Sequence, residues 1–184
     1  MKKLGALLLL ALACGPISQN PVWTKPCGGD VKVSVSAITL GDPCGGSGAQ
    51  ALRDSEFADC AGAGCGCRQS SLQLDVVSTA HSPANLEVRA VRLYDSRTGA
   101  LVDTLTPSNP RRWLNNQYSP WNGQVAPNTT EKAMYDLSAP TYGGSSYLRI
   151  GAPTVYKTEV DVAVDGELRT LTGPDAQREP EVVT

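Results

Sequence analysis

Three cysteines lie close together in the sequence: Cys60, Cys65 and Cys67. Thiolates are the ligands that soft metal ions such as Cu(I) and Zn²⁺ prefer, so metal binding by this cluster is one interpretation. A structural zinc site usually adds a second Cys-x2-Cys pair or histidines, which this segment lacks. Disulfide formation is therefore the preferred interpretation, and we expect neither a bound metal nor a cofactor.

The disulfide interpretation involves more cysteines than this cluster. With Cys14 set aside for the reason given below, the candidates are Cys27, Cys44, Cys60, Cys65 and Cys67. An odd number leaves one thiol free, or bonded to another molecule. A bridge between Cys65 and Cys67 would be strained, so we expect each to pair elsewhere, and the connectivity stays open. Two such bridges would pin the Gly/Cys-rich loop of residues 41–69 and stabilise the fold by about 2–4 kcal/mol each.

The sequence contains a single histidine, His81, in a predicted β-hairpin turn between Ala80 and Ser82. A Ser–His or Cys–His catalytic arrangement would need this residue, but no nucleophile motif accompanies it. Nothing in the sequence marks a pair of catalytic carboxylates either. We therefore predict that the protein is not an enzyme.

Two of the three tryptophans and one tyrosine lie in segment 111–123, RRWLNNQYSPWNG. Aromatic rings beside amides and arginines suit stacking on sugars, and the same residue types anchor protein interfaces. In the alternative interpretation, Trp121 fills the end of a β-sandwich and Asn122-Gly123 is only a turn. That alternative is preferred for Trp121, and both interpretations stay open for the other aromatics. The candidate binding residues are Arg112, Trp113, Tyr118 and Trp121.

Composition bounds the class of protein. The formal net charge of −2 over 184 residues argues against a nucleic-acid-binding protein that works by electrostatics. Thirteen prolines and eighteen glycines, among many valines, leucines and threonines, are typical of an all-β protein rich in turns.

The N-terminus predicts export. Lys2 and Lys3 precede ten uncharged residues, 4–13, which are too few for a membrane-spanning helix of roughly 20 residues. The run Leu10-Ala11-Leu12-Ala13-Cys14 resembles the lipobox of bacterial lipoproteins, although Ala11 replaces the preferred branched residue. The resemblance implies that Cys14 is lipidated and becomes the first residue of the mature chain. It also implies that the protein is exported and held at a membrane, with the outer membrane or the periplasm as the expected location, while the leaflet stays open. An ordinary cleaved signal peptide is the alternative.

Period-two alternation of apolar residues predicts β-strands along the rest of the chain. The central stretch, 70–105, reads as three strands, the second of which slips by one residue near Ala90, as at a bulge. We expect residues 106–130 to be a long polar connection and Asp165-Gly166 to be a two-residue hairpin turn. The other expected strands span residues 31–40, 132–138, 147–151, 156–164 and 167–171.

Seven or eight short antiparallel strands predict a Greek-key β-sandwich, stapled by disulfides at its Gly/Cys-rich loop. The run from Leu93-Tyr94-Asp95 through Thr98-Gly99 to Trp121-Asn122-Gly123 resembles immunoglobulin-like and fibronectin-type modules of bacterial envelope proteins. This resemblance concerns residues 86–137 and implies a fold, not a function. The expected organisation is a signal peptide at 1–13, a lipidated tether at 14–26, a sandwich domain at 27–173 and a flexible tail at 174–184.

These inferences combine into one expectation. The chain is predicted to be a non-enzymatic, lipid-anchored protein of the cell envelope that acts as a structural, accessory or protein-binding subunit. Its expected partners are the membrane, through the anchor, and another envelope protein. The alternatives are polysaccharide binding through residues 111–123 and metal binding through Cys60, Cys65 and Cys67. No nucleic-acid partner is expected.

Overall fold

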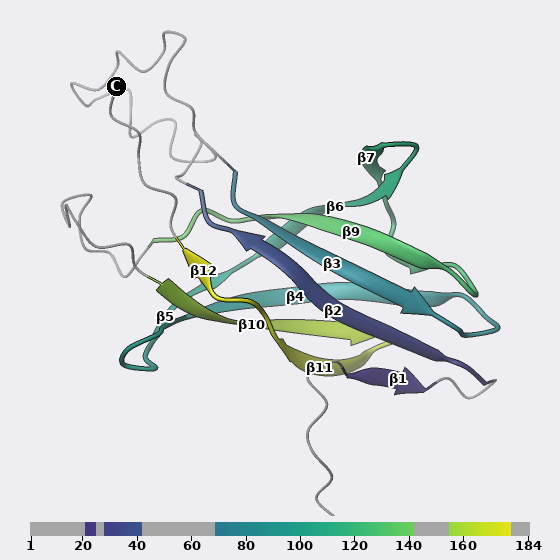
Figure 1. The fold of residues 1–184 in the computed structure, drawn as a ribbon, viewed down its shortest axis with the longest axis horizontal. Coiled ribbons are helices and arrows are strands. Elements are labelled where there is room, and N and C mark those ends of the chain that lie inside the picture. Colours follow the sequence, from purple (N-terminus) through teal and green to yellow (C-terminus); the bar gives the residue numbers. More distant parts are fainter. Residues whose placement is uncertain (1–20, 25–27, 42–68, 142–154, 178–184) are drawn as a thin grey trace, which may run out of the picture.

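The computed structural model describes residues 21–24, 28–41, 69–141 and 155–177. All the regular elements in these ranges are β-strands (Figure 1). Their bounds are β1 Val22–Thr24, β2 Asp30–Thr39, β3 Ser71–Ser78, β4 Ala84–Asp95, β5 Leu101–Leu105, β6 Pro107–Leu114, β7 Gln117–Pro120, β8 Gln124–Val125, β9 Thr130–Leu137, β10 Val155–Val164, β11 Glu167–Thr172 and β12 Ala176–Gln177.

The strands form two antiparallel sheets that face each other (Figure 1). Sheet I has the order β1-β2-β3-β9-β6-β7. Sheet II has the order β11-β10-β4-β5, with β12 also paired to β10 and β8 to the first residues of β4. The predicted all-β sandwich is therefore confirmed, with more strands in the described residues than the seven or eight expected.

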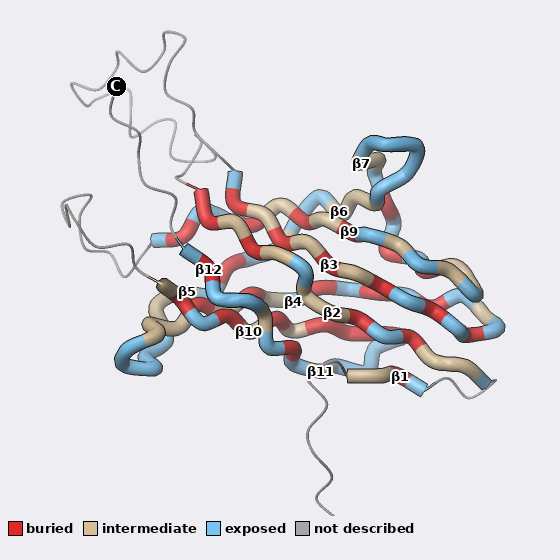
Figure 2. The backbone as a smooth tube through the Cα atoms, viewed as in Figure 1, coloured by how far each residue is buried: buried red, intermediate tan, exposed pale blue. Residues whose placement is uncertain are grey.

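The core lies between the sheets and comes from the alternation seen in the sequence. Leu72, Leu74 and Val76 of β3 are fully buried, and Val160 and Val162 of β10 face them from sheet II. Figure 2 shows the resulting succession of buried and less buried residues along these strands. Thr158 is a buried polar residue on the same face of β10, and its hydroxyl donates to the carbonyl of Pro174 at 2.8 Å. The pattern therefore identified the inward face of each of these strands.

The slip predicted in the second strand of the central stretch is a β-bulge. Ala90 of β4 lies opposite Asp161, whereas Val88 lies opposite the next residue, Val162, so Arg89 is the extra residue. The bulge lets Val88 and Val91 both point into the core although they are three residues apart. The predicted turn at Asp165-Gly166 is also present, with φ values of 49° and 85°.

The predicted long polar connection at 106–130 is wrong. This segment contains β6, β7 and β8. Its prolines hid the strands, since proline cannot donate to a sheet ladder, but β7 is an edge strand and tolerates Pro120. In β6 the pairing register shifts between Ser108 and Arg111, which accommodates Pro110.

Two other expectations also differ from the structure. The segment around His81 does not close a hairpin, because β3 and β4 belong to different sheets and the chain crosses between them there. Ala176, expected in the flexible tail, is 1% exposed and pairs with Tyr156 of β10. Trp23, the tether residue whose type favours packing onto the domain, is 1% exposed, and its indole N–H donates to the Glu167 carbonyl at 2.9 Å. The expected strand at 147–151 lies outside the described residues.

Candidate functional site

The segment that the sequence singled out for binding forms a hairpin at the edge of sheet I. Strands β6 and β7 pair through Arg111–Pro120, Arg112–Ser119, Trp113–Tyr118 and Leu114–Gln117. Asn115 and Asn116 form the connecting turn with φ values of 52° and 63°. Two consecutive residues at positive φ are the mark of a type I′ turn, and asparagine tolerates this conformation better than most residues. We call residues 107–120 the aromatic hairpin.

The hairpin carries two aromatic rings in contact near its tip. Trp113 and Tyr118 lie opposite each other, with ring centroids 4.9 Å apart and planes at 71°, which is an edge-to-face arrangement. Trp113 is 45% exposed and its neighbour Leu114 is 46% exposed. Trp113 and Leu114 therefore both meet solvent, on opposite faces of the hairpin, and Tyr118 lies on the same face as Trp113.

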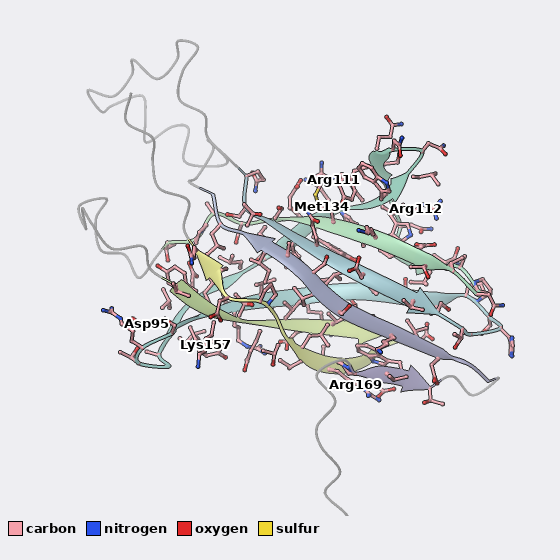
Figure 3. All side chains as sticks on the ribbon, viewed as in Figure 1. Asp95, Arg111, Arg112, Met134, Lys157 and Arg169 are labelled. Atoms are coloured by element: carbon pink, nitrogen blue, oxygen red, sulfur yellow. The ribbon has the colours of Figure 1, made fainter. Side chains whose placement is uncertain are left out.

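The two arginines of the hairpin are directed back toward β9 (Figure 3). Arg111 pairs with Asp136, whose other carboxylate oxygen accepts a hydrogen bond from the Asn109 side chain at 3.1 Å. Arg112 lies 3.8 Å from the carboxylate of Glu131. These ion pairs join the hairpin to the sheet, so the candidate residue Arg112 has a positioning role in addition to any contact with a ligand.

Trp121 is not part of this exposed surface. It is 7% exposed, and its indole N–H donates to the Gln124 carbonyl at 3.0 Å. Asn122 and Gly123 form a tight turn, in which the carbonyl of Gly123 accepts a hydrogen bond from Leu86 N–H at 2.8 Å. Trp121 therefore fills the core beneath this turn, in line with the structural interpretation of the sequence.

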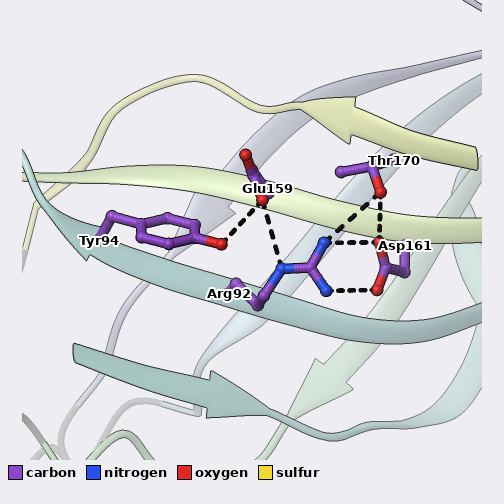
Figure 4. A network of polar contacts seen from close by, with 5 residues as sticks. All are labelled: Arg92, Tyr94, Glu159, Asp161 and Thr170. Atoms are coloured by element: carbon purple, nitrogen blue, oxygen red, sulfur yellow. Dashed lines mark hydrogen bonds and ion pairs between the residues drawn. The ribbon is translucent and has the colours of Figure 1, made fainter. Parts of the chain in front are cut away.

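A polar network that the sequence did not indicate lies on the outer face of sheet II (Figure 4). Arg92 of β4 donates two hydrogen bonds to Asp161 of β10, at 2.5 and 2.7 Å, and a third to Glu159 at 3.3 Å. Tyr94 donates to Glu159 at 2.9 Å, and Thr170 donates to Asp161 at 2.7 Å. The bidentate Arg92 contact holds the pKa of Asp161 below its usual value, although burial opposes this shift. Each charge is satisfied by its neighbours, so the network joins strands and leaves little capacity for a ligand.

The remaining candidate residues are not brought together in the described part of the chain. His81 is exposed in the crossover between the sheets. Within residues 21–24, 28–41, 69–141 and 155–177, no group of three or more His, Cys, Asp or Glu side chains could hold a metal ion. Cys14 and the disulfide candidates Cys27, Cys44, Cys60, Cys65 and Cys67 lie outside these ranges. The same ranges contain no helix long and apolar enough to cross a membrane.

Comparisons with known proteins give distant structural matches only. No family model matches the chain, and no curated protein matches its sequence. A family 123 glycoside hydrolase from Clostridium perfringens superimposes with a TM-score of 0.31 at 16% identity, over 59% of this chain and 20% of the hydrolase chain. The GAE domain of yeast GGA1 superimposes with a TM-score of 0.23 at 9% identity, over 88% of this chain and 100% of the domain. Neither similarity is close enough to bear on function, and this chain spans only about a fifth of the hydrolase.

Proposed function

We propose that this chain is a lipid-anchored accessory protein of the cell envelope that binds a partner protein through the aromatic hairpin. The observation that carries the proposal is the contact between Trp113, which is 45% exposed, and Tyr118 on one face of an edge hairpin. Single exposed apolar residues are ordinary, but a tryptophan and a tyrosine in contact on one face are the residue types that anchor interfaces, and Leu114, 46% exposed, adds apolar surface on the other face of the hairpin. The proposed fold family is the immunoglobulin-like one, supported by the strands that pass between two facing antiparallel sheets.

The geometry of the aromatic pair favours a protein partner over a polysaccharide. Sugar rings stack on flat aromatic faces, and a chain of sugars suits several faces in one plane. The rings of Trp113 and Tyr118 stand at 71° to each other, so the tyrosine does not extend the indole face into such a platform. A pair of rings at this angle instead presents a ridge that fits into a pocket of a partner protein.

The position of the hairpin is compatible with a membrane anchor at the N-terminus. Strand β1, which lies within the last residues of the proposed tether, forms one edge of sheet I, and β7 forms the opposite edge. Five strand spacings of about 4.8 Å place these edges roughly 24 Å apart. A partner at the hairpin would therefore not compete for space with the anchored edge of the domain. The lipobox resemblance supports Cys14 as the anchor, and export supports the proposed disulfides.

Site-specific photo-crosslinking in cells tests the proposal. A photoreactive amino acid replaces Leu114 at the hairpin tip and, in a control, Leu168 of β11, which is 52% exposed. We expect one defined protein adduct from position 114 that is absent at position 168 and disappears with Trp113→Ala and Tyr118→Ala together. Equal adducts at both positions, or no adduct at 114, would contradict a partner site at the hairpin. Retention on purified envelope polysaccharide that depends on Trp113 would replace it with the carbohydrate alternative.

The anchor has its own test. Replacing Cys14 by Ala should move the protein from the membrane fraction to the soluble exported fraction. Membrane association that survives this replacement would contradict lipidation at Cys14, while leaving the hairpin proposal standing.

A further inference from the structure

A second candidate site lies between β4 of sheet II and strands β6 and β9 of sheet I, away from the aromatic hairpin's tip. A cavity of about 270 Å³ opens there, lined by residues 85–88 of β4, the first residues of β6, the Asn122-Gly123 turn and Tyr135 of β9. We call it the β4 pocket. Its volume is close to the lower end of small-molecule sites, which is enough for one amino-acid side chain or a small organic molecule.

The pocket exists because the pairing of β4 is interrupted on one side. Strand β8 pairs with Ala84 and Asn85, and β5 begins to pair only at Val91. Between these points Leu86 N–H bonds to Gly123, and residues 87–90 have β10 as their strand partner among the described residues. This stretch of β4 therefore presents backbone oxygen and N–H groups at the pocket instead of a complete ladder.

Tyr135 supplies a hydroxyl to the pocket. The residue is 5% exposed and lines the pocket, and its hydroxyl forms no hydrogen bond with the described residues, yet this oxygen is not one of the fully buried unpaired atoms. The hydroxyl is therefore open to the pocket, where it can donate to or accept from a ligand. Burial, and in second place the charge of Glu87, raise the pKa of Tyr135, so the hydroxyl keeps its proton.

The lining of the pocket contains one charged residue, Glu87, and no cationic residue. Asn85, Ser108 and Asn122 are its other polar residues apart from Tyr135, and the side-chain oxygen of Asn122 already accepts a hydrogen bond from Gln124 N–H at 3.0 Å. The Glu87 carboxylate accepts a hydrogen bond from Arg89 at 3.0 Å, but both side chains are more than half exposed, so this pair is weak. Oxygen acceptors around one carboxylate match a group that carries several N–H donors and a positive charge.

We propose that the β4 pocket binds a cationic nitrogen group, either an ammonium or a guanidinium. Glu87 provides the charge, the Tyr135 hydroxyl accepts one N–H, and the open backbone of β4 provides further oxygens. The source is a Lys or Arg side chain of a peptide, or a free organic amine. Arg89 competes for the same carboxylate from outside the pocket, so its removal should strengthen binding.

The test is a ¹⁵N–¹H NMR titration of the purified protein with three probes. They are acetyl-Thr-Lys-Thr-amide, its neutral counterpart acetyl-Thr-Gln-Thr-amide, and spermidine. We expect saturable shifts of the Val88 and Gly123 amide signals, with the lysine peptide binding about tenfold more tightly than the glutamine peptide, as a hydrogen bond to a charged group allows. Tighter binding of the lysine peptide than of spermidine assigns the site to peptides, and the reverse order assigns it to free amines.

Variants complete the test. Glu87→Gln should remove the preference for lysine, and Tyr135→Phe should weaken binding several-fold without lowering the free energy of unfolding, because its hydroxyl has no partner to lose. Glu167→Gln is the matched control, since Glu167 pairs with Arg169 two residues along an exposed strand, as Glu87 does with Arg89, and is not one of the residues that line the β4 pocket. No saturable shift with either cation, equal binding of the glutamine peptide, or the same loss in Glu167→Gln would overturn the proposal. None of these results depends on the partner of the aromatic hairpin.

Discussion

Replacing Gly123 by alanine should destabilise the protein far more than the same replacement at Gly99. Both glycines adopt positive φ, at +82° and +70°, where an alanine costs about 1 kcal/mol or slightly more. A methyl group at Gly99 would meet nothing within 4 Å, so the conformational cost is the whole effect there. At Gly123 the methyl carbon would lie 2.5 Å from the carbonyl oxygen of Leu86, which is backbone and cannot move aside cheaply.

The turn must therefore shift in the Gly123 variant. This shift breaks the hydrogen bond from Leu86 N–H to the Gly123 carbonyl, which contributes about 1 kcal/mol, and disturbs the packing of Trp121 below the turn. We expect a loss of about 1 kcal/mol for Gly99→Ala and about 3 kcal/mol for Gly123→Ala. In a protein of this size the melting temperature should fall by roughly 2–4 °C per kcal/mol.

Urea unfolding followed by tryptophan fluorescence measures both values. The midpoint should move while the slope stays constant, since both variants unfold to the same chain. Gly166→Ala provides a second control, because this glycine also has positive φ, +85°, and open space around it. If Gly123→Ala and Gly99→Ala differ by less than about 0.5 kcal/mol, the close approach of the turn to β4 is not a constraint, and the geometry of the β4 pocket wall would need revision.

Three further predictions concern the polar network and the hairpin. Asp161→Asn should cost about 1–3 kcal/mol at neutral pH, because Arg92 loses a bidentate charged partner in a half-buried position. The pKa of Asp161 is lowered in the folded state, so the ionised carboxylate stabilises the fold above the unfolded-state pKa near 4, and this contribution is lost as the pH falls through the folded-state pKa. A difference in unfolding free energy between wild type and variant that persists unchanged to the lowest pH would contradict this. Asn116→Gly should raise the melting temperature slightly and Asn116→Ala should lower it, because the residue has a φ of 63°, and the opposite order would mean that the turn is not of the primed type. A double-mutant cycle of Trp113→Ala and Tyr118→Ala should give a coupling of about 0.5–1.5 kcal/mol in unfolding, and additive losses would show that the two rings do not touch in solution.

The strands that were predictable from the sequence are those in which each residue faces either the core or the solvent. Strand β10 is the clearest case, since its inward residues from Tyr156 to Val164 are all buried. Strand β6 was missed because polar and apolar residues do not alternate along it. Arg111 and Arg112 are consecutive, so the two faces of the strand do not differ in polarity. The Asn115-Asn116 pair was the one local signal for a hairpin in that segment, because both residues tolerate positive φ.

The two sites differ in how much of them the sequence could indicate. Trp113 and Tyr118 were identified as candidates because large aromatic side chains often anchor interfaces and stack on ligands. Only the structure places the two residues opposite each other. The β4 pocket could not be predicted, since it depends on where β8 stops and β5 starts to pair with β4. The partners of Arg92 were equally hidden, because Glu159 and Asp161 lie 67 and 69 residues away in the chain.

Both proposed sites lie where strand pairing ends, and the packing of the domain explains why. The space between the sheets is filled by apolar side chains, and the outer face of sheet II is occupied by charges that satisfy one another. Edges are then the places where backbone groups and large side chains are left without partners inside the fold. The aromatic hairpin offers apolar surface at the edge of sheet I, whereas the β4 pocket offers oxygen acceptors at a gap in sheet II. A partner that placed an apolar cleft over Trp113 and a basic side chain in the β4 pocket would use both features, and the affinity for such a partner should fall with either Trp113→Ala or Glu87→Gln but not with Glu167→Gln.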